Sequence, residues 1–296
     1  MLSILIPVYN TSVFELVSSI SKMAEALTIA YEIIVIDDAS TASETLDANE
    51  FLWELKNCTY IKSKANKGRT ATSEWLAKRA AYELLLFLDA DVLPASPQFL
   101  KNIIDNHKQA SVIFGGIQYE QTPPEPQKML RYIYGIKRED RSLEIRRKQP
   151  HLSITPAALF IKKDLYLSLK IPVHNSYGLD ILLTYRLKKK EVTILHIENS
   201  VIHLGIEDSE VYLQKTYEGL RTLAHLEKQN LISETYRPIQ RIARRMQKSG
   251  LSRGFLKLFE RVLKRAEKNL CSPRPSLKLF DSYRLYYFLK IKQDNA

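Results

Sequence analysis

Two carboxylates, one residue apart, are the first feature of this sequence that could do chemistry. Asp89 and Asp91 flank Ala90, directly after the apolar run Leu84–Leu88 and just before Pro94. An apolar run without alternation predicts a strand covered on both faces, and the proline ends it. Ligands of open α/β sheets bind beyond the carboxyl ends of the strands. Such a pair can bind a divalent cation that neutralises a diphosphate, but most isolated Asp-x-Asp pairs are solvated loop acids, so both interpretations stay open at this point.

Polar side chains also follow the two earlier expected strands. Tyr9 and Asn10 come after the first strand, and Asp37 and Asp38 come after the second. In a parallel sheet, side chains at these positions suit a nucleotide. A carboxylate or amide at a strand end can instead accept backbone N–H bonds as a helix cap, and this alternative stays open for Asn10, Asp37 and Asp38.

Strands and helices alternate along the chain, which predicts a parallel, doubly wound sheet. The expected strands are Leu2–Val8, Glu32–Ile36, Thr59–Lys62, Leu84–Leu88, Ser111–Tyr119, Leu152–Lys162, Val192–His196 and Val201–His203. The expected helices cover 13–27, 42–55, 70–81, 98–107, 176–190 and 208–229, and Thr11 or Ser12 is expected to cap the first. Segment 120–150, with four prolines and a run of charges, predicts helix fragments and a mobile loop.

Composition excludes several classes of protein. The 296 residues can hold one large domain with an appendage. The two cysteines, Cys58 and Cys271, have no metal-ligand spacing and predict neither a zinc site nor a disulfide framework. No uncharged apolar stretch approaches about 18 residues, and the first residues lack the basic flank of a secretory signal. We therefore expect a cytoplasmic protein without a membrane span.

Positive charge is concentrated near the C-terminus. The formal net charge is +11, and segment 236–268 carries eleven Lys and Arg against two acids. Basic amphipathic helices suit an anionic bilayer, which predicts peripheral contact with the inner face of a membrane. In the alternative, the apolar stripe packs on the catalytic body and the charges are solvated. No nucleic acid is expected, because no recognised motif accompanies the charge. The stripe comprises Phe255, Leu258, Phe259, Val262, Leu263 and Ala266.

Taken together, the motifs resemble those of the family 2 glycosyltransferases, which use nucleotide sugars and have the GT-A fold. The resemblance runs from Leu2 to about Gly205. It rests on Ile6–Asn10, Ile34–Ser40, Asn66-Lys67-Gly68 with Arg69, Asp89-Ala90-Asp91, Tyr177–Asp180 and His203–Gly205. Two departures stand out. Leu179 replaces a common Glu, and Ala71-Thr72-Ser73 stands where the family usually has Ala-Arg-Asn.

The resemblance implies a fold and an activity. The fold is α/β: a Rossmann-like nucleotide-sugar-binding (GT-A) domain over residues 1–206 with a mostly parallel central sheet, followed by a helical, basic region over 207–296. The activity is inverting transfer of a sugar from a nucleotide-sugar donor, a UDP-sugar, to a glycan or lipid-linked acceptor, as in polysaccharide biosynthesis. A divalent metal, Mn²⁺ or Mg²⁺, would be the cofactor.

The resemblance also assigns roles to residues. Tyr9 and Asp37 would contact the base and ribose, and Asp180 would be the catalytic base, unless it only caps its helix. The donor-binding set is Pro7, Tyr9, Asp37, Asp38, Arg69, Asp89 and Ala90. The metal-binding set is Asp89, Asp91 and His203.

Several arginines and one histidine have alternative interpretations. Arg69 would hold the diphosphate, or it is a solvated helix residue. His203 would complete the metal shell, or it is a structural histidine. One arginine of the long loop would close over the diphosphate. The candidates there are Arg138, Arg141, Arg146 and Arg147.

Two other functions compete with this interpretation. A catalytically degenerate α/β body could serve as a basic module that binds a membrane or nucleic acid. A nucleotidyltransferase is the other, but those enzymes usually have a glycine-rich loop after the first strand, and residues 7–12 contain no glycine. Neither Gly-x-Gly-x-x-Gly nor a Walker-type loop occurs, which counts against dehydrogenases and P-loop enzymes.

Overall fold

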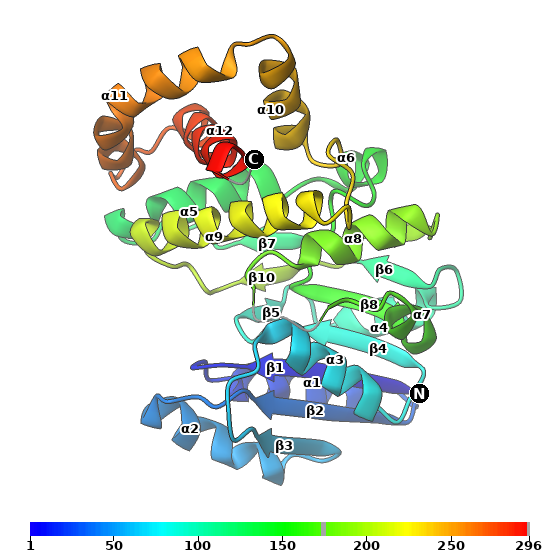
Figure 1. Ribbon diagram of the computed structural model, residues 1–296. Helices are drawn as coiled ribbons and strands as arrows, with labels where there is room; N and C mark the ends of the chain where they lie inside the picture. The colour runs from blue at the N-terminus through cyan, green and yellow to red at the C-terminus, as the bar shows by residue number, and fades with distance from the viewer. Residues whose placement is uncertain (173–175, 295–296) are drawn as a thin grey trace. The chain divides into compact units, whose positions relative to one another are not determined.

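A computed structural model describes residues 1–172 and 176–294 (Figure 1). These residues form two compact units. The first unit comprises the described residues within Met1–Glu120, Glu139–Asn175 and Arg186–Gly205, and the second those within Gln121–Arg138, Ser176–Tyr185 and Ile206–Ala296. The helical C-terminal region therefore shares its unit with two segments from the first 206 residues.

The first unit is built on a seven-stranded sheet in the order β3-β2-β1-β4-β8-β6-β9. Its strands are β1 (Leu2–Val8), β2 (Tyr31–Asp37), β3 (Cys58–Lys62), β4 (Leu84–Leu88), β6 (Val112–Phe114), β8 (Ala158–Lys162) and β9 (Ile194–His196). All neighbouring pairs are parallel except the two that involve β8. The side chains of β1 and β4 are almost entirely buried, as unbroken apolar strands in a sheet covered on both faces should be. The expectation of a mixed α/β fold with a mostly parallel sheet is confirmed.

A three-stranded sheet, β5-β10-β7, accompanies the large one. It consists of β5 (Val92–Pro94), β10 (Val201–His203) and β7 (Ile117–Tyr119). Segment 111–119 is thus two strands in two sheets, and the expectation of one strand there was wrong. The break lies at Gly115 and Gly116: a Cβ at Gly115 would lie 1.8 Å from the Asn199 carbonyl oxygen, and Gly116 has φ +103°.

Helices cover the large sheet and connect its strands. They are α1 (Phe14–Glu25), α2 (Ser43–Glu50), the 3₁₀-helix η1 (Phe51–Glu54), α3 (Arg69–Arg79), α4 (Phe99–Asn106), α6 (Leu143–Lys148) and α7 (Lys163–Ser168). Helix α8 (Asp180–Lys189) begins in the second unit and ends in the first.

Two capping expectations were wrong. Helix α1 follows Val13, whose N–H donates to Asn49 Oδ1 at 2.9 Å, and no side-chain cap comes from Thr11 or Ser12. Asn10 does not cap this helix either: its Oδ1 accepts the N–H groups of residues 41 and 42, in the loop just before α2, at 2.8 and 3.1 Å. Because Asn10 has φ +49°, the chain turns sharply after β1 and carries this amide to the neighbouring loop.

Segment 120–150 is more helical than its prolines and charges predict. It contains a 3₁₀-turn (Pro126–Lys128), α5 (Met129–Tyr134), a π-helix (Gly135–Glu139) and then α6. Pro126 occupies the first turn of its helix, where its missing N–H costs no hydrogen bond. Leu130 and Tyr132 are buried, so packing orders this segment. The later strand, expected from residue 152, begins only at Ala158, beyond Pro156.

The second unit is helical. Besides α5 and the start of α8, it contains α9 (Ser209–Lys228), α10 (Pro238–Lys248), α11 (Ser252–Leu270) and α12 (Leu277–Asp294). Helix α12 packs against both α9 and α11 (Figure 1). The core between them is Leu130, Tyr212, Leu213, Phe259, Ala266, Leu270, Phe280, Tyr283 and Tyr286. Across residues 1–172 and 176–294, no helix has the length and apolarity that crossing a bilayer requires.

Candidate active site

The small sheet brings His203 to Asp91. Asp91 directly precedes β5, and the antiparallel pairing of β10 with β5 places His203 opposite Val92. The Leu204 N–H donates to the Asp91 carbonyl oxygen at 2.8 Å. As a result, His203 Nε2 lies 3.5 Å from Asp91 Oδ2. Two residues expected to share a metal are therefore neighbours in the fold.

Gly205 and Tyr119 shape the surroundings of this pair. A Cβ at Gly205 would lie 2.2 Å from Asp91 Oδ2, so only glycine lets the chain after β10 pass beside the carboxylate. The Tyr119 ring lies 5.5 Å from that of His203, and its hydroxyl donates to the Glu139 carboxylate. Sequence reasoning missed Tyr119, because its place beside His203 depends on the parallel register of β7 and β10.

Asp89 has a different partner. The Arg69 guanidinium donates to Asp89 Oδ1 and, at 3.1 Å, to the Pro156 carbonyl oxygen. Arg69 is the first residue of α3, and its side chain is about half exposed. Arg69, expected to bind the diphosphate, and Asp89, expected to bind the ribose or the metal, therefore form an ion pair with each other. A ligand contact by either residue would have to be made alongside that pair or replace it.

Asp38 holds the loop that leads into α3. Its Oδ1 accepts the Lys67 N–H at 2.9 Å and its Oδ2 accepts the Gly68 N–H at 2.7 Å. Gly68, the residue before Arg69, has φ +83°, a conformation that favours glycine. Since Asp38 is buried, its carboxylate fixes where α3 starts. Asp38 thus accepts backbone N–H bonds, as the capping alternative has it, and these bonds hold the loop just before α3.

Asp37 organises the turn after β2. Its Oδ1 accepts the Ser40 N–H at 2.6 Å and its Oδ2 accepts the Tyr60 hydroxyl at 3.1 Å. Burial, together with the negative charge of Asp37, raises the pKa of Tyr60 well above its ordinary value, so the phenol stays protonated and donates. The carboxylate is buried, whereas Tyr9 at the end of β1 is about half exposed. Tyr60 is a second residue that sequence reasoning missed.

The arginines of segment 120–150 have other partners. Arg146 is buried and donates to the carbonyl oxygens of Phe114, Ile197 and Arg141 at 3.1 to 3.3 Å. Burial lowers the pKa of its guanidinium. Arg146 is therefore a structural residue, not the arm expected to close over a diphosphate. Arg138 pairs with Asp281 at 2.8 Å, and Arg147 donates to the His196 carbonyl oxygen at 3.5 Å.

Asp180 belongs to the second unit, where it opens α8. The residue before it, Leu179, is buried, so a core side chain stands where the family commonly has Glu. Gly178 has φ +89°, and a Cβ there would lie 3.3 Å from Gly219 Cα on α9. Close packing against α9 thus fixes the backbone that carries Asp180. Its role as the base remains a prediction.

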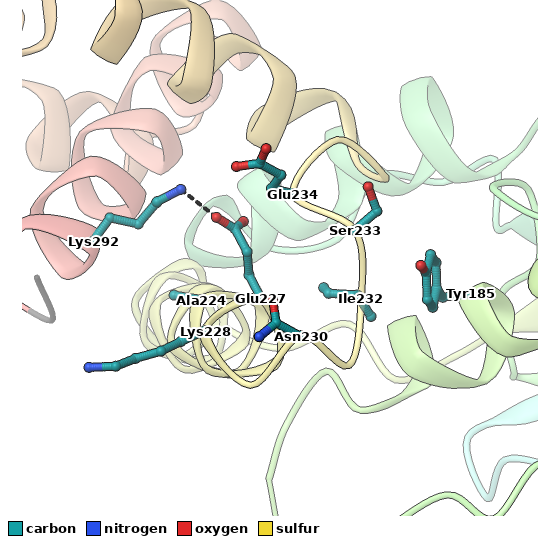
Figure 2. A pocket seen from close by; sticks show the side chains of 9 residues that line it. All are labelled: Tyr185, Ala224, Glu227, Lys228, Asn230, Ile232, Ser233, Glu234 and Lys292. Atoms are coloured by element: carbon teal, nitrogen blue, oxygen red, sulfur yellow. Dashed lines mark hydrogen bonds and ion pairs between the residues drawn. The ribbon is translucent and has the colours of Figure 1, made fainter.

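A cavity of about 610 Å³ lies within the second unit (Figure 2). Glu227 faces Lys292 across it and forms an ion pair with that side chain. The other Glu227 oxygen accepts a hydrogen bond from Gln240 Nε2 at 2.7 Å. Because this carboxylate is already paired, we do not assign the reaction to the cavity. It is lined by Tyr185, Ala224, Glu227, Lys228, Asn230, Ile232, Ser233, Glu234 and Lys292, which include none of the expected site residues.

The residues beside Asp91 fit a metal that needs further ligands. Within the described ranges, no group of three or more His, Cys, Asp or Glu side chains is placed to hold a metal ion. Asp91 and His203 nevertheless offer one oxygen and one nitrogen ligand, 3.5 Å apart. Mg²⁺ is commonly bound by one or two carboxylates together with substrate phosphates and water. Two protein ligands are therefore enough if the substrate supplies phosphate oxygens.

Comparison with known proteins gives one family and a set of similar folds. The sequence model of glycosyl transferase family 2 matches residues 3–166. Among curated protein sequences, none matches the chain.

Solved structures with similar folds include proteins from S. aureus and Mycobacterium tuberculosis. A crystal structure of S. aureus TarS aligns with TM-score 0.51 and 18% identity over 76% of this chain, which spans only 39% of that protein. The TarS 1–349 fragment in complex with UDP-GlcNAc gives 0.50 and 16%, covering 99% of this chain and 91% of the fragment. Glucosyl-3-phosphoglycerate synthase from Mycobacterium tuberculosis, in complex with Mn²⁺, UDP and glucosyl-3-phosphoglycerate, gives 0.52 and 13% over 76% and 79%. At such identities these likenesses establish the fold.

Proposed function

The chain belongs to glycosyl transferase family 2, and from this premise we propose that it is an inverting enzyme that moves a sugar from a UDP-sugar to a hydroxyl group of a glycan or lipid-linked acceptor. The observation that carries the proposal is the contact between Asp91 and His203 beside the carboxyl end of β4, with their Nε2 and Oδ2 atoms 3.5 Å apart. In α/β sheets, this edge is where nucleotides bind.

Asp91 and His203 would hold Mn²⁺ or Mg²⁺. The metal would offset the negative charge that develops on the departing nucleoside diphosphate. Arg69 would bind the same diphosphate with charge-assisted hydrogen bonds, and Asp89 would keep its guanidinium oriented until the donor arrives. Asp89 would then be available to the ribose or the metal.

The nucleoside would lie over the ends of β1 and β2. Asp37, held by Tyr60 and by the Ser40 N–H, presents a fixed carboxylate to the base, and the exposed ring of Tyr9 supplies a stacking surface. Pro7 and Ala90, both partly buried, would form the walls of this site. Uridine is the proposed nucleoside because similar folds bind UDP-GlcNAc and UDP. Asp38 would act indirectly, by holding the loop that positions Arg69.

Transfer also requires a base for the acceptor. We assign this role to Asp180 at the start of α8, whose carboxylate would remove the proton as the acceptor oxygen attacks the anomeric carbon. The carbon–oxygen bond to the diphosphate breaks as the new glycosidic bond forms, so the anomeric configuration inverts. The buried Leu179 leaves Asp180 without the acidic neighbour common in the family.

The acceptor is proposed by class only. A glycan or a lipid-linked glycan would fit a role in polysaccharide biosynthesis, and a lipid-linked one would favour peripheral contact with the inner face of a membrane through residues 236–268. This chain spans only 39% of TarS, so we do not assign the activity of TarS to it.

A panel of nucleotide sugars tests the proposal. The purified chain is incubated with each donor and Mn²⁺, and release of the nucleoside diphosphate is measured. We expect hydrolysis of at least one UDP-sugar, with loss of activity on chelation. Asp91→Asn should lose this hydrolysis, and Asp105→Asn is its matched control, because Asp105 is an exposed carboxylate that pairs with Lys101. Turnover of no nucleotide sugar, with or without metal, would contradict the proposal.

A further inference from the structure

The apolar stripe expected on α11 lies mostly in the core of the second unit. Phe259 and Ala266 are buried against α12, together with Leu270 at the end of the helix. Figure 1 shows α12 running along one side of α11. These residues pack on α12 within the second unit, not on the catalytic body as the alternative had it, and they cannot meet a bilayer. Leu258 and Val262 are the two members of the stripe that are classed as exposed.

These two residues belong to a second apolar row, on a neighbouring and exposed face of α11. Leu258 is 64% exposed, Val262 is 37% exposed, and Leu251, just before the helix, is 63% exposed. Residue 258 follows residue 251 by about two helical turns, and residue 262 follows residue 258 by about one turn, so the three share one face. Single exposed apolar residues are ordinary, but a row of them on one face indicates an interaction surface.

Positive charge surrounds the row. Arg261 and Arg265 lie on the same face, Lys257 borders it, and all three are exposed. No acidic residue occurs between positions 235 and 259, and Glu260 lies on a different side of the helix. The loop before α11 is open, since a Cβ at Gly250 would meet no atom within 4 Å. A partner of this face must therefore be anionic and must also accept apolar side chains.

We propose that this face of α11, formed by Leu251, Lys257, Leu258, Arg261, Val262 and Arg265, docks on an anionic lipid bilayer. The leucines would enter the boundary between headgroups and acyl chains, and the arginines would pair with lipid phosphates. Helix α10 also exposes basic and apolar side chains, namely Arg241, Ile242 and Arg245. This inference is independent of the transfer reaction, because no proposed donor, metal or base residue belongs to this face.

Two other partners fit less well. A soluble polyanion such as RNA would pair with the arginines, but it would leave Leu251 and Leu258 in water. A second copy of this chain would bring two faces of the same sign together, and like charges oppose such a contact. A bilayer with anionic headgroups satisfies both the apolar row and the charge.

Vesicle co-sedimentation of the full chain tests the inference. Phosphatidylcholine vesicles with and without phosphatidylglycerol are compared at low and high salt. We expect binding only to the anionic vesicles, weakened by salt. Arg261→Gln combined with Arg265→Gln should lower the partition coefficient about 20-fold or more, and Leu258→Gln about tenfold. Matched controls that should bind like wild type are Lys189→Gln with Lys190→Gln for charge and Ile145→Gln for an exposed apolar residue.

Each remaining outcome overturns the inference. Negligible binding to anionic vesicles at low salt would do so directly. Binding that the two arginine substitutions weaken but Leu258→Gln leaves unchanged would indicate a surface for soluble polyanions, and an RNA titration would then show comparable affinity. Concentration-dependent dimerisation that Leu258→Gln abolishes, without vesicle binding, would assign the face to self-association. UDP-sugar hydrolysis in solution should be equal in all variants, so a failure here leaves the proposed reaction intact.

Discussion

His203 Nε2 lies 3.5 Å from Asp91 Oδ2, although strands of both sheets and several helices separate the two residues along the chain. The contact depends on β5 and β10, two strands of three residues each, whose antiparallel register leaves no freedom in where His203 is placed. The chain after His203 must then pass directly beside the carboxylate. The geometry of the proposed metal site is therefore sensitive to backbone changes that remove no ligand.

Gly205→Ala tests this sensitivity. The new Cβ would overlap Asp91 Oδ2, so the carboxylate or the chain after β10 has to move. We expect metal-dependent donor binding to fall at least about tenfold, because misplacing a site by about 1 Å is costly. Isothermal titration with UDP and Mn²⁺ measures this. Gly254→Ala is the matched control: nothing lies within 4 Å of its added Cβ, and it should stabilise α11 by about 0.5–1 kcal/mol. Unchanged affinity in Gly205→Ala would show that the close approach is unimportant.

Asp38→Asn should destabilise the loop before α3. Asp38 accepts hydrogen bonds from two backbone N–H groups, one on each carboxylate oxygen. In the variant, one of these N–H groups would face an amide NH₂ instead of an oxygen. We expect the free energy of unfolding to fall by about 1–3 kcal/mol, as for a buried donor left unsatisfied. Donor affinity should also fall, because Arg69 follows directly. Urea denaturation and UDP titration measure the two effects. A wild-type stability would mean that water replaces the lost bond or that the single amide oxygen accepts both N–H groups.

Asp180→Asn separates the base from a structural cap. If Asp180 removes the acceptor proton, the variant should keep its affinity for UDP and lose transfer about 10²-fold or more. Single-turnover transfer and UDP titration give the two quantities. Loss of donor binding together with a lower melting temperature would instead make Asp180 a residue that only supports α8.

Acid should destabilise the first unit through His196. Burial, with help from the cations Arg146 and Arg147, lowers the pKa of this imidazole to about 4, against 6.5 for an exposed histidine. The folded chain therefore binds fewer protons than the unfolded chain between these values. Stability is fully present above about pH 6.5 and is lost as the pH falls through about 4, by about 3 kcal/mol for this residue. Urea midpoints between pH 7.5 and 4.5 measure the loss, and His196→Gln should make it smaller. An identical slope in the variant would assign the effect to other groups.

Sequence alone predicted most of the large sheet, because Leu2–Val8 and Leu84–Leu88 are unbroken apolar runs that only a buried strand can use. The acids at the ends of these strands were found for the same reason. Tyr119 and Tyr60 were not, since their contacts with His203 and Asp37 arise from strand register, which leaves no local signal.

The helical parts were harder to predict. In segment 120–150, prolines and charges indicated a loop, but buried side chains such as Leu130 order it as helix. Arg146 was one of four arginines of which a single one was expected to contact the diphosphate, and only the carbonyl oxygens that surround it reveal a core residue. On α11 the periodicity located the helix correctly, but it could not show which apolar residues face α12 and which face outward.

Titration of UDP into the chain with Mn²⁺, with EDTA, and with Mn²⁺ in an Asp91→Asn variant tests the central claim most directly. If Asp91 and His203 hold the metal that binds the donor diphosphate, wild type binds UDP with Mn²⁺ and at least about tenfold more weakly with EDTA, and Asp91→Asn behaves like the chelated wild type with an unchanged melting temperature. Equal UDP affinity in all three samples, or no UDP binding in any of them, would contradict the account.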